Sequence, residues 1–233
     1  MSIYSKIVST MLPISSIYTA VEGTIKPINQ VYVFVNNERH LIFPESKLIY
    51  EKNSAGSYSF TIPDQYNIIK IVLAGACGGR NWQSDGDGIY AQEAPGRGAV
   101  IERIVEHVNN RTVSGIIGAR PTMSYGSEQG GGTGYHNGEN ANTKSVTVKF
   151  ISAGGGGGSS SASIDGVTFE ACGGGGRSSG VALASQLWGA KGGGEYGGPR
   201  QNGSWVNGND AVDPDAVGYN MGNGYIRIYG LAG

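Results

Sequence analysis

The sequence has few charged residues and no long apolar run, and these shortages exclude several classes of protein. Charged residues make up 15% of the 233 residues, and the formal net charge is -1; ordinary globular chains carry roughly 25% charged residues. The lysines and arginines are scattered and form no basic face, so we expect neither nucleic acid nor an anionic membrane as a partner. No apolar run approaches the ~18 residues of a membrane span, so membrane insertion is not expected.

The N-terminus lacks the pattern of a signal peptide, and cysteine is scarce. Pro13, Ser15 and Ser16 interrupt the only apolar stretch near the start, so we expect the chain to be made and folded in a cytoplasm. This expectation is compatible with later release as part of a particle. Cys77 and Cys172 are the two cysteines. In this setting free, buried thiols are expected, and a disulfide between them is the alternative.

Glycine, in contrast, is abundant and unevenly distributed. The chain has 41 glycines, and only Gly23 and Gly56 precede Gly75. This step in composition predicts an N-terminal domain of residues 1–56 and a glycine-rich domain of residues 57–233.

The N-terminal domain is expected to contain a β-hairpin. Residues 31–35 are a β-branched and aromatic run, Asn36 and Asn37 suit a two-residue turn, and residues 38–43 supply the second strand. Residues 47–50 predict a third short strand. Residues 1–25 show no clear period, and we expect them to pack on a partner; the alternatives are a disordered tail or a strand of the same domain.

The glycine-rich domain predicts strands and almost no helix. Residues 68–74 are continuously apolar, which indicates a strand buried on both faces. The predicted strands are 57–63, 68–74, 99–105, 112–117, 145–151, 167–171 and 225–229. Asn-Gly turns are expected at Asn137, Asn202, Asn207 and Asn223.

The glycine runs are expected to be ordered. They occupy 78–79, 154–158, 173–176 and 192–194 with 197–198, and in several places a hydrophobic strand leads directly into them. A flexible linker would have polar flanks and would join two domains. We therefore predict buried, extended backbone with three residues per turn, packed side by side. Collagen is excluded because no Gly-X-Y period is sustained, and low-complexity disorder is the alternative.

The order of these motifs resembles the glycine-rich protein domain. The pattern is a strand ending in proline (58–63), a strand entering glycines (68–75), a covering strand (96–101), a strand ending in glycine (113–118) and an apolar strand before a glycine block (151–158). The resemblance covers roughly residues 57–230. Related domains occur in phage tail proteins and in the extracellular parts of some animal receptor kinases. The chain is also similar to phage tail-fibre tip adhesins, in which polyglycine helices form a sandwich and distal loops contact the receptor.

The resemblance implies an all-β fold: a small N-terminal β-hairpin attachment domain followed by a glycine-rich β/polyglycine-II sandwich domain. It implies a bacteriophage tail adhesin, located in the virion, that recognises an outer-membrane protein or glycan of the host bacterium. Residues 1–56 would attach to a phage tail or fibre protein. Two alternatives are a structural virion protein (a tail or head decoration) with the same fold, and a hydrolase of host-surface glycan.

No motif for catalysis, cofactor or metal binding stands out. Residues 192–197 satisfy GxGxxG, but the strand and helix that a dinucleotide site needs are missing around them. Residues 85–88 begin like a calcium loop without its later ligands. A solvated acidic loop is favoured over an ion site at Asp210, Asp213 and Asp215. The histidines have no metal-ligand spacing, and each is expected to be solvated: His40, His107 and His136. We therefore expect a non-enzymatic protein without cofactor or metal.

The tryptophans and several tyrosines point to a binding surface. They lie among Gly, Ser and Asn, which is the composition of antibody paratopes. The predicted adhesive loops are 79–91, 122–139 and 187–208. The predicted receptor-binding residues in them are Trp82, Tyr90, Tyr125, Tyr135, Trp188, Tyr196 and Trp205. We expect about half of these rings to cover exposed glycine backbone instead.

Overall fold

The computed structural model describes most of the chain, and it is all-β there. The described residues are 17–21, 24–28, 31–35, 38–43, 46–84, 89–92, 95–121, 131–141, 143–146, 149–177, 189–200 and 207–231. Within these ranges there are seventeen strands and no helix. All of the strand pairs are antiparallel.

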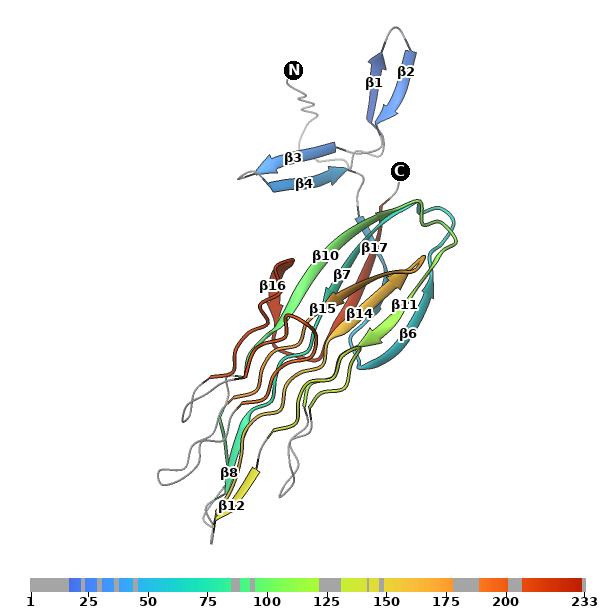
Figure 1. The fold of residues 1–233 in the computed structure, drawn as a ribbon. Helices are drawn as coiled ribbons and strands as arrows, with labels where there is room; N and C mark the ends of the chain where they lie inside the picture. The colour runs from blue at the N-terminus through green and yellow to red at the C-terminus, as the bar shows by residue number, and fades with distance from the viewer. Residues whose placement is uncertain are drawn as a thin grey trace.

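Two antiparallel sheets face each other in the middle of the molecule (Figure 1). The first has the order β16 (Ala216–Asn220), β10 (Gly98–Glu106), β7 (Ile68–Ala74), β17 (Tyr225–Leu231) and β5 (Ser46–Lys52). The second has the order β15 (Val167–Ala171), β14 (Ser160–Ile164), β11 (Thr112–Ile117) and β6 (Gly56–Thr61). The last strand of the chain therefore lies between β7 and β5 in the first sheet.

The main hydrophobic core lies between these two sheets. Alternate residues of each strand point inward, as the two-residue period of a strand requires. β7 supplies Ile69, Ile71 and Leu73, and all three are almost completely buried. Further members of the same cluster come from both sheets: Tyr58, Ile101, Val113, Ile117, Ala162, Ile164, Ala171, Ile226 and Ile228. The two sheets thus share one continuous core.

The hairpin of β14 and β15 has the tightest turn of the second sheet. Ile164 pairs with Val167, so only two residues form the loop. Asp165 and Gly166 have φ of 48° and 80°. Two positive φ values in a two-residue loop are the pattern of a type I′ turn, which suits the twist of the flanking strands.

Smaller sheets lie at the two ends of the molecule. The strands β12 (Thr143–Val146), β13 (Lys149–Ser152), β8 (Asn81–Ser84) and β9 (Ile89–Gln92) pair in that order. Two separate hairpins consist of β1 (Ile17–Val21) with β2 (Thr24–Ile28), and of β3 (Val31–Val35) with β4 (Glu38–Phe43). Figure 1 shows β8 and β12 at the end opposite the two hairpins.

Between the core and the strands β8 and β12, extended glycine-rich segments run side by side (Figure 1). We call them the glycine bundle, and they comprise residues 75–79, 95–98, 118–121, 131–141, 153–159, 172–177, 189–200 and 207–211. Their backbone groups bond to neighbouring segments. The N–H groups of Gly75 and Gly78 donate to Ala99 and Gly96, whereas those of Ala76 and Gly79 donate to Gly158 and Gly155. The partner segment thus recurs at every third residue, the repeat of a backbone with three residues per turn.

Two segments are surrounded by others on all sides. The segment 154–159 bonds to five stretches of backbone: 76–79, 119, 132–139, 174–177 and 190–193. The segment 173–177 bonds to six: 76–79, 96, 154–157, 190–193, 198 and 209. The glycines of both segments are buried. Their amides need these partners because water does not reach them.

At the glycines of these runs, neighbouring backbones leave no space for a Cβ atom. A Cβ on Gly156 would overlap the carbonyl oxygen of Lys191, and one on Gly176 would overlap that of Gly154. Positive φ is not the reason, since only Gly56, Gly166 and Gly194 have it among the described glycines. The backbone conformation is open to any residue, and the close approach of neighbouring backbones admits only glycine.

Most of the strands follow the sequence expectations. The hairpin 31–35/38–43 and the strands near 47–50, 57–63, 68–74, 99–105, 112–117, 167–171 and 225–229 are confirmed. The single strand expected at 145–151 is wrong, because β12 and β13 form an antiparallel pair there. The pairs β1–β2 and β8–β9 and the strands β14 and β16 were not predicted. These strands are only four or five residues long, which is too short to show a clear two-residue period.

The domain boundary expected at residue 56 from the change in glycine content does not separate one sheet from another. β5 precedes the expected boundary at residue 56, yet it pairs with β17 over the length of both strands. Residues 46–52 thus belong to the same sheet as β7 and β10. The expectation that residues 1–56 attach the protein to a partner stays a prediction.

The packing makes a graded prediction for glycine substitutions. Gly156→Ala should destabilise the protein by about 3 kcal/mol or more because the added Cβ overlaps backbone on a fixed neighbour, which lowers the melting temperature by roughly 6–12 °C. Gly175→Ala should have a smaller effect, because its Cβ would lie 3.0 Å from the nearest carbonyl oxygens, those of Gly198 and Pro199. Thermal melts of the purified proteins measure both.

Gly218→Ala is the matched control, because nothing lies within 4 Å of a Cβ at that position of β16. Its melting temperature should equal or slightly exceed that of the parent. Equal melting of the Gly156→Ala and Gly218→Ala proteins would contradict the close packing of the bundle.

Candidate functional site

Of the seven predicted receptor-binding residues, the structure shows two with exposed side chains. Tyr135 is 45% exposed and Tyr196 is 41% exposed, and both belong to the glycine bundle. Trp82 and Tyr90 were expected in a loop, and this expectation is wrong: they lie on β8 and β9. Backbone pairing of β8 with β13 and β9 gives this polar segment the hydrogen bonds of a sheet. Three further residues lie outside the described residues: Tyr125, Trp188 and Trp205.

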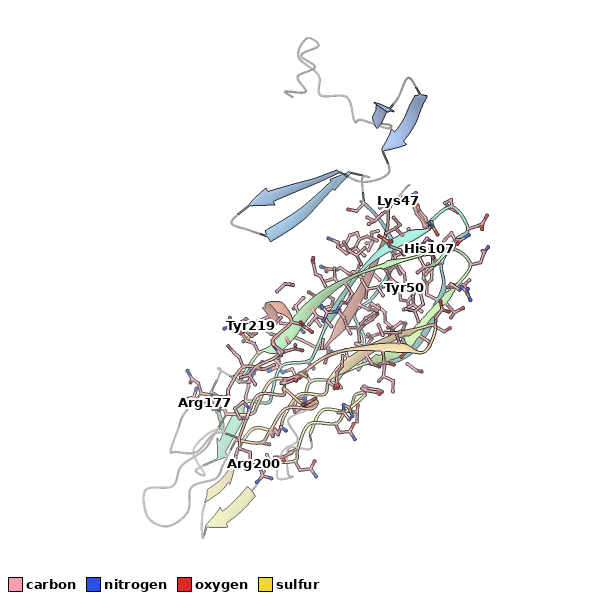
Figure 2. All side chains as sticks on the ribbon, turned by 45° about the horizontal axis from the view of Figure 1, so that its top comes forward. Lys47, Tyr50, His107, Arg177, Arg200 and Tyr219 are labelled. Atoms are coloured by element: carbon pink, nitrogen blue, oxygen red, sulfur yellow. The ribbon has the colours of Figure 1, made fainter. Side chains whose placement is uncertain are left out.

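A surface cavity of about 400 Å³ lies next to Tyr135 in the glycine bundle. Its volume is within the range of about 300–1,000 Å³ that is typical of small-molecule sites. Polar side chains and bare glycine backbone line it: His136, Asn137, Glu139, Lys191, Gly192, Gly193, Gly194 and Glu195. We call it the bundle cavity. Arg200, which binds Glu139 of its wall, lies toward the end of the molecule that is remote from Lys47 (Figure 2).

Hydrogen bonds to the central segment 154–159 fix both walls of the bundle cavity. On one wall, Ser159 donates its N–H to the carbonyl of His136, and Gly156 donates to that of Glu139. On the other wall, Gly193 donates to the carbonyl of Gly157. The walls also bond to each other, since the N–H of Glu139 donates to the carbonyl of Lys191. The cavity is therefore formed before any ligand arrives.

Glu139 is a fixed anion at the edge of the bundle cavity. Its Oε2 accepts a 2.7 Å bond from Nε of Arg200 and a 3.1 Å bond from the backbone N–H of Lys191. Burial by itself raises the pKa of Glu139, but these two bonds and the nearby positive charges outweigh it and hold the pKa below its ordinary value. Both bonds end on Oε2, so Oε1 takes part in neither of them.

His136 is held by a carboxylate and by a neighbouring ring. Its Nδ1 lies 2.7 Å from Oε1 of Glu170, which is the distance of a hydrogen bond. A carboxylate only accepts, so Nδ1 carries the proton and Nε2 is left outside this bond. The ring of Tyr135 meets that of His136 edge to face at 4.6 Å. The imidazole side chain is 56% exposed, in agreement with the expected solvated histidine.

Gly194 is needed in the floor of the bundle cavity for a different reason from the other glycines. Its φ is +93°, which disfavours any other residue. A Cβ there would lie 2.6 Å from Sγ of Cys172 and 2.7 Å from Oε1 of Glu170. A side chain at this position would thus disturb the carboxylate that holds His136.

The two cysteines and the acidic cluster are accounted for by structural roles. Cys77 and Cys172 are free and buried, as expected. Burial raises the pKa of the Cys172 thiol to about 12, so it is protonated and unreactive at neutral pH. Asp210 accepts bonds from the backbone and guanidinium of Arg97. Asp215 pairs with Arg103, so two of the three acidic charges are each matched by an arginine.

Comparisons with known proteins add no family. No protein-family model and no curated protein sequence matches this chain. Within the described ranges, no helix combines the length and the apolar character that a membrane crossing requires. In the same ranges, no group of three or more His, Cys, Asp or Glu side chains is placed to hold a metal ion. What the protein does must therefore be argued from the geometry.

Sequence reasoning missed the bundle cavity. Its polar residues come from two segments more than fifty positions apart, and none of them forms a recognised motif. The available signal was local: His136, Asn137 and Glu139 surround an Asn-Gly turn, and Lys191 and Glu195 flank a glycine run.

The ion pair at the cavity predicts a pH-dependent effect on stability. Because the folded-state pKa of Glu139 is depressed, its stabilising contribution is complete above the ordinary pKa of 4.5 and is lost as the pH falls through the folded-state value. Glu139→Gln should therefore lower the melting temperature at pH 7, by an amount equivalent to about 1 kcal/mol or less because the pair is largely exposed. The deficit should shrink below pH 4.5.

Glu195→Gln is the matched control for this measurement, because it removes a carboxylate from the same cavity. Arg200 pairs with Glu139, whereas no comparable ion pair with the Glu195 carboxylate is seen among the described residues. Its melting temperature should follow that of the parent at each pH. A Glu139→Gln deficit that persists unchanged at pH 3 would show that the carboxylate charge is not what stabilises the wall.

Proposed function

We propose that this protein is a bacteriophage tail adhesin that recognises a receptor on the surface of the host bacterium. The observation that carries the proposal is the glycine bundle. It extends from the sandwich formed by the two facing sheets toward the end opposite the β1–β4 hairpins (Figure 1). A bundle of this kind holds recognition residues on rigid backbone and keeps them away from the end that attaches to the particle. The resemblance to phage fibre-tip adhesins points to the same division of roles.

We further propose that the bundle is a polyglycine-II sandwich. Three observations support this: the partners of residues 75–79 recur at every third residue, two inner segments bond to surrounding backbone in many directions, and a Cβ at most of the bundle glycines would overlap a neighbouring carbonyl. Glycine loses more conformational entropy on folding than any other residue. A bundle that bonds nearly every inner amide compensates for that loss.

The proposed receptor surface combines aromatic residues at the far end with the exposed tyrosines of the bundle. Trp82 and Tyr90 lie on the sheet at the end remote from the hairpins. Tyr135 and Tyr196 are exposed on the bundle. Aromatic anchors set among polar and glycine residues are typical of adaptable protein or glycan recognition. Residues 1–56 would then attach the protein to a tail or fibre protein, which accounts for their different composition.

Monovalent binding to host cells tests the proposed surface. Truncation of an aromatic anchor commonly costs ~2 kcal/mol or more, which is over tenfold in affinity. We therefore expect at least one of Trp82→Ala, Trp188→Ala and Trp205→Ala to weaken binding of the purified protein at least tenfold. The melting temperature of each variant must match that of the parent. Measurement with monovalent protein is essential because avidity on a particle hides such losses.

Tyr219→Ala is the control for this test. Tyr219 is also aromatic and 49% exposed, but it lies on β16, the edge strand of the five-stranded sheet (Figure 2). It should bind host cells like the parent. If no tryptophan variant weakens binding while deletion of residues 1–25 abolishes it, the attachment and recognition ends are the reverse of those proposed. A parent protein that neither binds host cells nor blocks infection supports the structural virion component instead.

A further inference from the structure

We propose that the bundle cavity is a saccharide-binding site that takes one or two sugar units of a host-surface glycan. This inference rests on the proposed function and names the ligand of one part of the recognition surface. It differs from recognition by the far-end loops, because the cavity is formed by the packed segments of the bundle itself. The polar side chains that line it, its fixed shape and the adjacent Tyr135 carry the argument.

The lining of the bundle cavity matches hydroxyl groups. A sugar hydroxyl both donates and accepts, so a site for it needs acceptors and donors close together. Glu195 and Oε1 of Glu139 are acceptors, and Lys191 donates. Asn137 accepts a 3.0 Å bond from the N–H of Gly134 through its Oδ1, so its amide nitrogen lies outside that bond. The set therefore offers both kinds of group on two facing walls.

Tyr135, which lies beside the lining and not in it, would supply the apolar surface that a sugar ring requires. Its ring is 45% exposed and rests edge to face against that of His136, a member of the cavity lining. Glu170 holds His136 at the other side of the imidazole ring. The C–H face of a pyranose packs on such an aromatic ring while its hydroxyls reach polar groups. Tyr and similar residues with an apolar body and polar tip suit this mixed surface.

The charges of the lining disfavour other small ligands. Arg200 neutralises Glu139, which leaves the carboxylate of Glu195 and the ammonium of Lys191 in the lining. These two charges cancel, so a phosphate or sulfate group would meet no net positive charge. No aliphatic side chain lines the cavity, so an apolar anchor from a protein loop would meet only the carbon atoms of glycines and of polar residues. A hydroxyl-rich, uncharged ligand is the remaining match.

The glycine floor makes the site rigid. Gly192, Gly193 and Gly194 contribute backbone alone, and Gly192 and Gly193 donate their N–H groups to Gly198 and Gly157. A floor that is fixed before binding avoids the entropy of ordering a loop around a small ligand. This matters for single sugars, whose affinity is low because each buries little surface.

Saccharide binding to the full-length protein tests the proposal. The probes are D-glucose, D-galactose, N-acetyl-D-glucosamine, lactose and L-glycero-D-manno-heptose, measured by saturation-transfer NMR and titration. We expect saturable binding of at least one sugar. Glu195→Gln and Lys191→Met should each weaken it at least fivefold, and Tyr135→Ala at least threefold. Lys47→Met and Glu106→Gln repeat the first two changes at exposed positions on β5 and β10, and they should leave binding unchanged.

Three outcomes would overturn the inference. They are a parent that binds none of the five sugars, cavity variants that bind like the parent, and displacement of the bound sugar by inorganic phosphate. Host-cell binding by the same preparation separates this failure from failure of the proposed function. If the parent binds cells but no sugar, the adhesin stands and the saccharide site is wrong. If it binds sugar through the cavity but not cells, the adhesin proposal is wrong and the site stands.

Discussion

Hydrogen bonding between buried glycine backbones is the interaction on which the rest of this structure depends. An unpaired buried amide costs about 1–3 kcal/mol, and the segments 154–159 and 173–177 carry many amides away from water. They satisfy them by bonding to five and six surrounding stretches of backbone. Such close approach leaves no room for a Cβ, as the overlap at Gly156 shows. The high glycine content therefore allows the backbones to approach closely enough for their buried amides to form hydrogen bonds.

The bundle and the sandwich support each other through continuous strands. β7 runs from the hydrophobic core directly into residues 75–79, and β15 runs into 172–177. At this junction Ser160 accepts a bond from the N–H of Gly118 and donates its hydroxyl proton to the carbonyl of Ala74. The core therefore fixes where each glycine segment starts. Without that anchorage, extended glycine has no preference for one alignment over another.

The low charge content is consistent with packing through backbone hydrogen bonds. The charged residues that are present link neighbouring segments. Arg97 and Asp210 join two segments that are more than a hundred residues apart in sequence, through bonds to both backbone and side chain. Arg200 and Glu139 join two segments 61 residues apart beside the bundle cavity, through a bond between their side chains. Most contacts in the bundle are made by backbone, so few charged side chains are needed. Those at its rim hold neighbouring segments and shape the proposed recognition site.

The sequence by itself determined the all-β class, most of the core strands and the order of the glycine runs. Alternation and apolar runs are local properties, which is why β7, β11 and β15 could be predicted to the residue. Tertiary structure alone decided the pairing of β5 with β17, the strands β8, β9, β14 and β16, and the bundle cavity. These features depend on which distant backbones meet. A glycine run is compatible with many neighbours, so its own sequence cannot select the one at which a carbonyl comes too close for a side chain.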